Sequence, residues 1–138
     1  MKIARTTDLA ACHALRRRVF IEEQAVPEAD ESDGLDADAL HYLATGNGAA
    51  LGCARVLIDG STAKIGRVCI APEARGTGAG AALMRSVMDD LRGRGDLARL
   101  KLSAQVQVIG FYERLGFVAY GPEYLDAGIS HRDMALEL

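Results

Sequence analysis

The sequence predicts an α+β fold in which helices interrupt a mixed β-sheet. Three strand-like runs follow one another with turn signals between them, which is typical of an antiparallel meander. Helical spacing of apolar residues appears before this meander and again after it, so helices and strands do not alternate regularly. With 138 residues, 49% of them hydrophobic and 25% charged, the chain has the size and composition of a single domain spanning residues 1–138.

The N-terminal part is predicted to form a short strand and one helix. Ile3–Arg5 is strand-like, and the side chain of Thr6, Thr7 or Asp8 can cap a helix that runs to about Phe20. Its shared apolar face carries Leu9, Cys12, Leu15 and Val19.

An acidic segment follows this first helix. Residues Glu22–Asp38 hold eight Asp and Glu residues, with no Lys or Arg among them, and include Pro27 and Gly34. This composition predicts a broken helix followed by a loop. It also suggests a negative surface that attracts a cationic substrate, against the alternative of a solvated loop that serves solubility. Arg16, Arg17 and Arg18 are interpreted as a mostly solvated face, with one of them bracing this segment.

The predicted meander consists of Leu40–Ala44, Ala49–Ile58 and Ala63–Ile70, with turns at Gly46–Gly48 and Asp59–Ser61. The Gly-rich turn after it opens a helix whose apolar face carries Leu83, Val87 and Leu91 and which Gly93 and Gly95 end. The remaining elements are predicted as a strand at Leu97–Leu102, a helix at Gln105–Leu115, and two strands at Phe117–Tyr120 and His131–Leu136.

Composition argues against several classes of protein. A net charge of −3 disfavours nucleic-acid binding, which normally needs a basic face. No apolar run approaches the length of a membrane span, and no leader-like segment opens the chain, so we expect a cytoplasmic protein without a membrane partner. The cysteines, Cys12, Cys53 and Cys69, are odd in number and are expected to be reduced thiols. Because His13, His41 and His131 are scattered, no metal site is predicted.

The most informative segment is the turn at Arg75–Gly80, which follows a strand and opens a helix. Bare backbone N–H groups at a helix start favour an anion, so the turn predicts a phosphate cradle. It also fits the G-x-G-x-x-A pattern of dinucleotide-binding folds, but Ala71–Arg75 separates the strand from the glycines and no ribose-binding acid follows Leu97–Leu102. The glycines are not followed by the Gly-Lys-Ser/Thr motif of nucleoside triphosphate-binding loops, so such a site is not predicted. The remaining alternative is a helix start that uses small residues for close packing.

A second motif, Phe111–Phe117 (FYERLGF), lies about thirty residues further on. In this order, the two motifs resemble the acetyl-CoA-binding core of the GNAT superfamily of N-acetyltransferases. Leu15–Gln24, His41, Ile65–Val68, Ala104-Gln105 and Gly128–Met134 resemble the ElaA-like branch of that superfamily. Ser130 stands where the branch often has Pro, and Asp133 where it usually has a small or apolar residue, which affects local loop geometry. The resemblance implies the GNAT fold, a mostly antiparallel twisted sheet flanked by helices.

The resemblance also implies a division of roles along the cofactor. The backbone of Val68, Cys69 and Ile70 would bind the pantetheine arm, and the N–H of Ile70 would face the thioester oxygen and stabilise the oxyanion. Tyr112 would lie beside the sulfur and protonate or hydrogen-bond the leaving thiolate. The pyrophosphate would be held by Arg75, Gly76, Thr77, Gly78, Ala79 and Gly80.

The expected reaction is direct attack of an amine on acetyl-CoA, without an acyl-enzyme or a metal. The general base stays open: the candidates are Glu23, His41 and His131, each of which also fits a purely structural hydrogen-bonding role. Cys69 lacks an adjacent base and is interpreted as a packing residue. The acceptor is a small-molecule or peptide amine, and a homodimer is compatible with the sequence. A noncatalytic acyl-CoA sensor and a dinucleotide-dependent oxidoreductase are the alternative functions.

Overall fold

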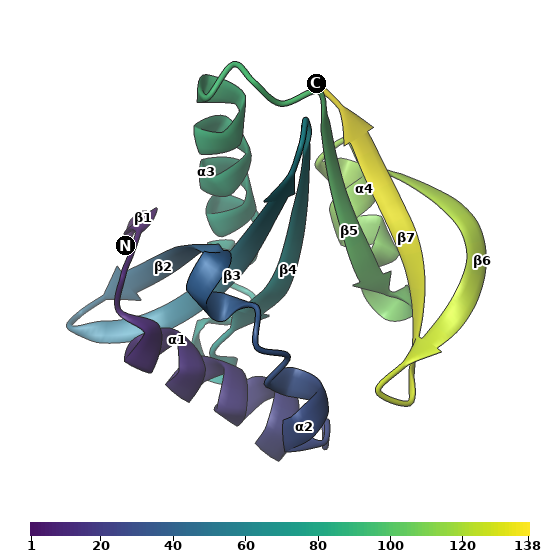
Figure 1. Cartoon of the computed structure of the whole chain (residues 1–138). Helices are drawn as coiled ribbons and strands as arrows, with labels where there is room; N and C mark the ends of the chain where they lie inside the picture. The colour runs from purple at the N-terminus through teal and green to yellow at the C-terminus, as the bar shows by residue number, and fades with distance from the viewer.

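The computed structural model describes all residues 1–138 and is built on one seven-stranded sheet (Figure 1). The strand order is β1-β2-β3-β4-β5-β7-β6, and only β4 and β5 run parallel. The predicted α+β class with a mixed sheet is therefore confirmed. The strands are β1 (Lys2–Arg5), β2 (Leu40–Gly46), β3 (Ala49–Asp59), β4 (Thr62–Ile70), β5 (Arg99–Gln105), β6 (Val118–Asp126) and β7 (Ile129–Glu137).

The first helix is longer than the sequence predicts. Helix α1 (Leu9–Arg16) is capped by the Asp8 side chain, which accepts a hydrogen bond from the Ala11 N–H at 3.1 Å. The chain then continues as a π-helical segment, Arg17–Glu23, before a short α2 (Glu28–Glu31) and a single 3₁₀ turn, Asp36–Asp38. The acidic segment is thus a broken helix, as predicted.

The later helices lie where the glycine and apolar patterns place them. Helix α3 (Ala79–Gly93) begins directly after Gly78, whose φ of +83° is easy only for glycine. Helix α4 (Ile109–Arg114) follows a 3₁₀ turn at Val106–Val108 and is shorter than the predicted Gln105–Leu115. Strand β6 extends to Asp126, six residues beyond its predicted end at Tyr120.

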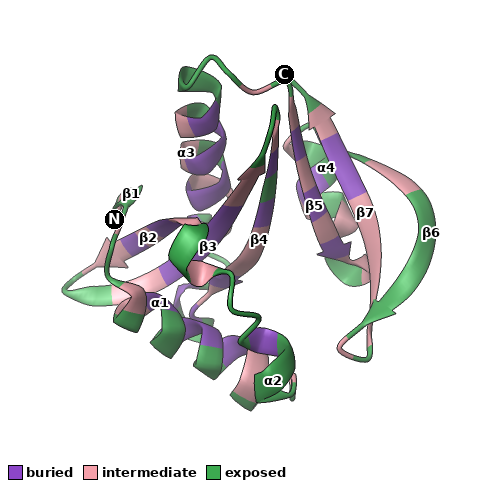
Figure 2. Cartoon of the chain, viewed as in Figure 1, coloured by how far each residue is buried: buried purple, intermediate pink, exposed green.

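Two clusters of buried apolar side chains lie on the two faces of the sheet. Figure 2 shows the buried residues on the helices and strands. On one face, α3 and α4 bury Leu83, Val87 and Tyr112 against strand residues such as Val56. On the other face, α1 buries a smaller cluster of six residues: Cys12, Leu15, Val19, Cys53, Cys69 and Ala71. Because neighbouring strand residues point to opposite faces, α1 and α3 pack on opposite sides of β3 and β4.

The sheet opens between its two parallel strands. Strand β4 pairs with β5 only from Thr62 to Ile65, so the edge of β4 that faces β5 has no partner strand beyond that point. A β-bulge lies at the same place, since Arg67 and Val68 together oppose Ala54 and Arg67 has a φ of +50°. The gap between β4 and β5 beyond Ile65 is where the candidate functional site lies.

A dinucleotide-binding domain is excluded by the topology, because such a domain is built on a parallel sheet and this sheet has one parallel pair. The alternative of a dinucleotide-dependent oxidoreductase is therefore wrong. No helix in the structure combines the length and the apolar character that crossing a lipid bilayer requires.

Candidate functional site

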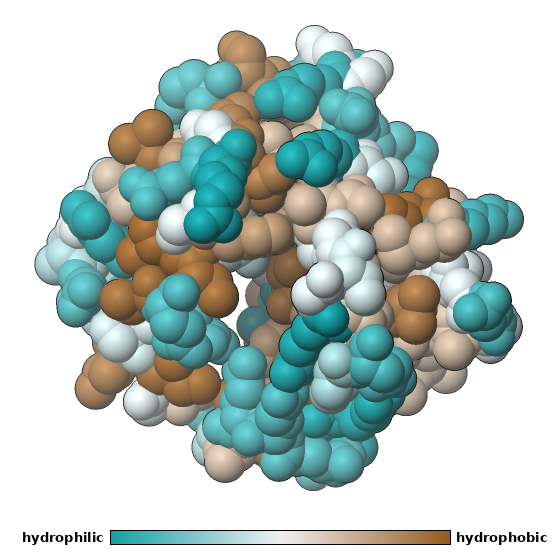
Figure 3. Space-filling view, turned by 180° about the vertical axis from the view of Figure 1, so that it is seen from behind, coloured by the Kyte–Doolittle hydropathy of each residue, from teal (hydrophilic) through white to brown (hydrophobic).

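A cavity of about 1040 Å³ occupies the split between β4 and β5. The space-filling view from behind shows a hollow near the middle of the molecule, with hydrophobic side chains on part of its rim and hydrophilic ones on the rest (Figure 3). Its walls come from β4, the glycine turn, α4, the end of β5, the β6–β7 turn and the acidic segment. Residues that are distant in the sequence therefore meet at one site.

Most of the predicted cofactor residues line this cavity. Val68, Cys69 and Ile70 contribute from the unpaired part of β4, as do Arg75, Gly76, Gly78, Ala79 and Gly80 from the turn and the start of α3. Thr77 does not line the cavity; its hydroxyl donates to the Ala74 carbonyl oxygen at 2.5 Å and so closes the turn. Both Gly76 and Gly78 have positive φ and open space where a Cβ would be. The turn leaves its backbone uncovered on the cavity side.

Arg75 is engaged by the protein itself. Its Nη1 and Nη2 donate to the two carboxylate oxygens of Glu23 at 2.6 Å each, and its Nε donates to the Ile70 carbonyl oxygen at 3.2 Å. These Arg75 hydrogen bonds also lower the pKa of Glu23. Glu23 does not line the cavity, so the structure shows it as the partner of Arg75 and gives no support for it as a base.

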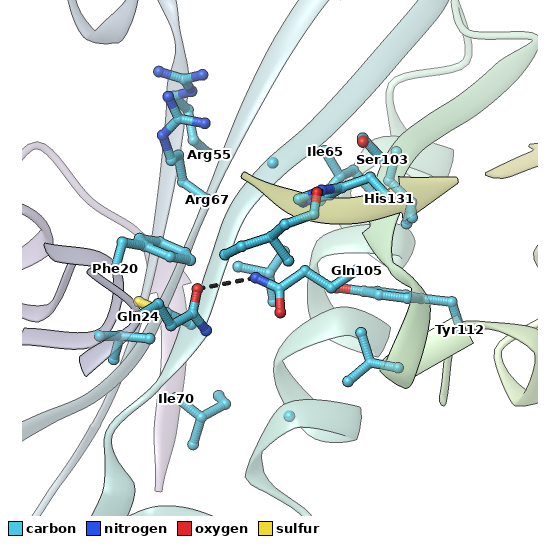
Figure 4. Close-up of a pocket in the computed structure, with 18 of the residues that line it drawn as sticks. Phe20, Gln24, Arg55, Ile65, Arg67, Ile70, Ser103, Gln105, Tyr112 and His131 are labelled. Carbon is cyan, nitrogen blue, oxygen red and sulfur yellow. Dashed lines mark hydrogen bonds between the residues drawn. The ribbon is translucent and has the colours of Figure 1, made fainter. Parts of the chain in front are cut away.

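Tyr112 is buried in α4 with its ring packed edge-on against Phe111 and Phe117, at centroid distances of 5.0 Å and 6.2 Å. Its side chain points into the cavity toward Gln105 (Figure 4). Burial raises its pKa to about 12. The hydroxyl is therefore a neutral hydrogen-bond donor over the whole working range of a protein, and the ring contacts hold it in place.

A hydrogen bond between two glutamine side chains crosses the cavity. The sequence alone did not indicate this contact. The Gln105 Nε2, at the end of β5, donates to the Gln24 Oε1, just beyond the π-helical segment, at 2.9 Å (Figure 4). In this view, Ile70 lies on one side of the bridge and Ser103 and His131 on the other. Both glutamines lie in segments that resemble the ElaA-like branch. Because they are 81 residues apart, no local sequence pattern predicts that they pair.

The three histidines have different surroundings. His41 is buried, its Nε2 lies 2.9 Å from the Asp36 carbonyl oxygen, and it does not line the cavity. His13 is half-exposed on α1 and pairs with the Asp36 carboxylate at 2.8 Å. Only His131, on β7, lines the cavity. The structure therefore gives His41 a structural contact and leaves it away from the expected acceptor.

Arginines pair with most of the acids in the acidic segment, so less of its negative charge is free than the sequence alone indicates. Five of its eight acids form ion pairs. Glu31 pairs with Arg16 at 2.5 Å and Asp36 with Arg16 at 2.9 Å, while Asp33 and Asp36 both pair with Arg55. Arg67 donates to the Asp33 carboxylate and to two backbone carbonyls of the segment.

This pairing confirms the interpretation of the arginine run, in which two arginines are solvated and one braces the acidic segment. Arg17 and Arg18 are half-exposed, but the side chain of Arg16 is only 1% exposed. Arg16 thus holds the acidic segment through Glu31 and Asp36, and residues of that segment line the cavity.

The three cysteines are free and buried. Cys53 and Cys69 lie directly opposite each other on β3 and β4, with their sulfur atoms 3.4 Å apart. Cys69 belongs to the apolar cluster under α1, in agreement with a packing role.

Comparison with known proteins identifies the family. A model of the acetyltransferase (GNAT) domain matches residues 5–138. The protein YyaT of Bacillus subtilis strain 168 is 37% identical over all of this chain and 97% of its own length. Protein ElaA of Escherichia coli K12 is 32% identical over 96% of this chain and 89% of its own length.

The solved structures agree with this assignment. An acyl-CoA N-acyltransferase from Pseudomonas aeruginosa is 34% identical to this chain and superimposes with a TM-score of 0.85, covering 97% of this chain and 96% of that one. The domain match and these relatives span nearly the whole sequence, so the ElaA-like resemblance is confirmed. The chain belongs to the GNAT acetyltransferases, whose general activity is the transfer of an acetyl group from acetyl-CoA to an amine.

Proposed function

We propose that this protein is a cytoplasmic N-acetyltransferase that binds acetyl-CoA in the split between β4 and β5 and acetylates a primary amine that enters the same cavity. One observation carries the proposal: the unpaired edge of β4, the open glycine turn and the Tyr112 side chain all face a single cavity. An extended pantetheine arm has the hydrogen-bonding groups to add to such an edge as a strand does.

Each part of the cavity then has a chemical task. The backbone N–H groups of the turn at Gly76–Gly80, at the start of a 15-residue helix, favour the pyrophosphate. The backbone at Ile70 offers a fixed donor for the oxyanion that forms when the amine attacks the thioester. Tyr112 donates to the sulfur as the thiolate leaves. Arg75, held by Glu23, completes the positive rim of the phosphate site.

The direct test is a screen of amines with the purified protein. Release of the CoA thiol from acetyl-CoA is measured with polyamines, aminoglycosides, free amino acids, and peptides that offer an α-amine or a lysine. An enzyme releases thiol faster in the presence of at least one class of amine than in its absence. Tight binding of CoA with no amine-dependent release would replace the proposal with the noncatalytic sensor.

The phosphate site gives the first variant prediction. Gly78→Asp places a carboxylate among the expected phosphates, and at about 4 Å such a repulsion costs roughly 1–4 kcal/mol. We expect CoA binding, measured by calorimetry, to weaken roughly 100-fold. Gly95→Asp is the matched control, because Gly95 also has a positive φ and open space where a Cβ would be, but lies after the other end of α3. Equal CoA affinity in the two folded variants would refute the cradle.

A further inference from the structure

We propose that His131 is the general base of the acetyl transfer and accepts the proton of the substrate amine at its Nε2. The inference rests on the proposed function and assigns a residue that the reaction needs. An amine arrives mostly as an ammonium ion at neutral pH, and an ammonium nitrogen has no lone pair with which to attack a thioester. A base or a chain of water molecules must therefore take that proton, and a side chain inside the cavity can take it directly.

The structure fixes which nitrogen of His131 is available. The Nδ1 lies 2.6 Å from the backbone carbonyl oxygen of Ile129. A carbonyl oxygen only accepts hydrogen bonds, so Nδ1 carries the hydrogen and the neutral ring keeps its lone pair on Nε2. No hydrogen bond within the chain engages Nε2, while His131 lines the cavity. A base with its lone pair free is what the reaction requires.

The ring is also held in a fixed position. It stacks on the Tyr124 ring at a centroid distance of 6.2 Å and an interplanar angle of 21°. The Tyr124 hydroxyl donates to the Asp133 carboxylate at 2.6 Å and accepts from the Ser103 hydroxyl. Since Gln105 and Tyr124 are the strand partners of His131 on β5 and β6, the imidazole is placed by three paired strands. A base on a sheet is positioned more precisely than one on a loop.

The other two candidates are hydrogen-bonded elsewhere and lie outside the cavity. The carboxylate of Glu23 is occupied by two donors of Arg75, and His41 is buried against Asp36 outside the cavity. Among the three candidates from the sequence, only His131 reaches the cavity with an unengaged acceptor atom.

The proton balance of the reaction follows. His131 Nε2 takes one proton from the ammonium ion, and the freed nitrogen forms a C–N bond with the thioester carbon while the carbonyl π electrons move to oxygen. Collapse of this intermediate breaks the C–S bond, and the sulfur leaves hydrogen-bonded to Tyr112. The nitrogen loses its second proton as the amide forms, and this proton ends on the CoA thiol. His131 returns its proton to solvent.

The first test needs no acceptor. Long-range proton–nitrogen NMR spectra of the protein labelled with nitrogen-15 distinguish the two neutral tautomers of each histidine. We expect His131 in the Nδ1–H form in the free protein, with assignment through the missing signals of His131→Gln. A dominant Nε2–H form would overturn the inference, because Nε2 would then have no lone pair.

The second test compares two amines of similar shape, ethylamine and 2,2,2-trifluoroethylamine. The first is an ammonium ion at neutral pH, whereas the second is already neutral and needs no base before attack. His131→Gln should lower kcat/KM for ethylamine by about 10²–10⁴-fold, the usual contribution of a general base. For trifluoroethylamine, the expected loss is less than about tenfold.

His13→Gln is the control, because His13 is half-exposed on α1 and lies outside the cavity. It should change neither rate. Equal losses for the two amines in His131→Gln would show a structural role and overturn the inference. Absence of transfer by the unmodified protein to every amine of the screen would instead reject the proposed function, and the tautomer measurement still decides the state of His131.

Discussion

Replacing Tyr112 by Phe is expected to lower kcat for acetyl transfer by about 10²-fold, with little change in the affinity for CoA. The change removes the hydroxyl that we propose lies beside the CoA sulfur and keeps the ring that packs against Phe111 and Phe117. General acids contribute roughly 10²–10⁴-fold. We expect the lower end, because burial raises the pKa of Tyr112 to about 12, well above the pKa of about 8.5 of an ordinary cysteine thiol. Full proton transfer to the thiolate is then uphill, so the hydroxyl acts mainly by donating a hydrogen bond.

The measurement is steady-state release of the CoA thiol with the best amine of the screen, together with calorimetric binding of CoA. Tyr120→Phe serves as the control, since Tyr120 lies on β6 and does not line the cavity. A fall in kcat of less than about threefold in Tyr112→Phe, with chemistry shown to limit the rate, would make Tyr112 a packing residue.

Local patterns were sufficient for most of the fold. The Asp8 cap, the turn at Asp59-Gly60 and the start of α3 after Gly78 each depend on a few adjacent residues, and the structure has them where the sequence predicts them. The first helix extends past its predicted end at about Phe20, because a π-helical segment continues it to Glu23. The length of β6 depends on its pairing with β7, a contact that its own exposed side chains do not encode.

The site was predictable where one motif supplies it and not where distant segments meet. The glycine turn and Tyr112 come from compact motifs, and both line the cavity. The bridge between Gln24 and Gln105 requires that the end of the first helix and the end of β5 face each other. The pairing of the acidic segment cannot be predicted locally for the same reason, since its partners Arg55 and Arg67 come from β3 and β4.

The arginine pairing predicts a large loss of stability for Glu31→Gln. Both partners of the Arg16–Glu31 pair are nearly inaccessible to solvent, and breaking a buried pair leaves an uncompensated charge, which costs about 3–5 kcal/mol. We expect about 3 kcal/mol here, because Arg16 keeps Asp36 as a second partner. The free energy of unfolding is measured in urea.

The matched control is Glu28→Gln, three residues earlier in the same segment. Glu28 pairs with Arg17, but both side chains are at least half-exposed, so the expected loss is below about 1 kcal/mol. Equal losses in the two variants would show that the buried Arg16–Glu31 ion pair contributes no more to stability than the exposed Arg17–Glu28 pair. The comparison also explains why neutralising several acids of this segment together cannot test attraction of a cationic substrate: unfolding would mask the effect.

Asp33 is expected to make the stability of the fold depend on pH, with lower stability in acid. Hydrogen bonds from Arg55 are the main cause that lowers its pKa to about 2, against about 3.9 in an unfolded chain. Between these values the unfolded state binds more protons, so the stability that Asp33 contributes is complete above about pH 4 and is lost as the pH falls through about 2. The expected contribution is about 2 kcal/mol. Asp33→Asn should therefore be less stable than the parent at neutral pH, and the difference should shrink as the pH is lowered toward 2 in the same urea titrations. A difference that stays constant with pH would mean that Asp33 contributes through its packing and not through its charge on Arg55.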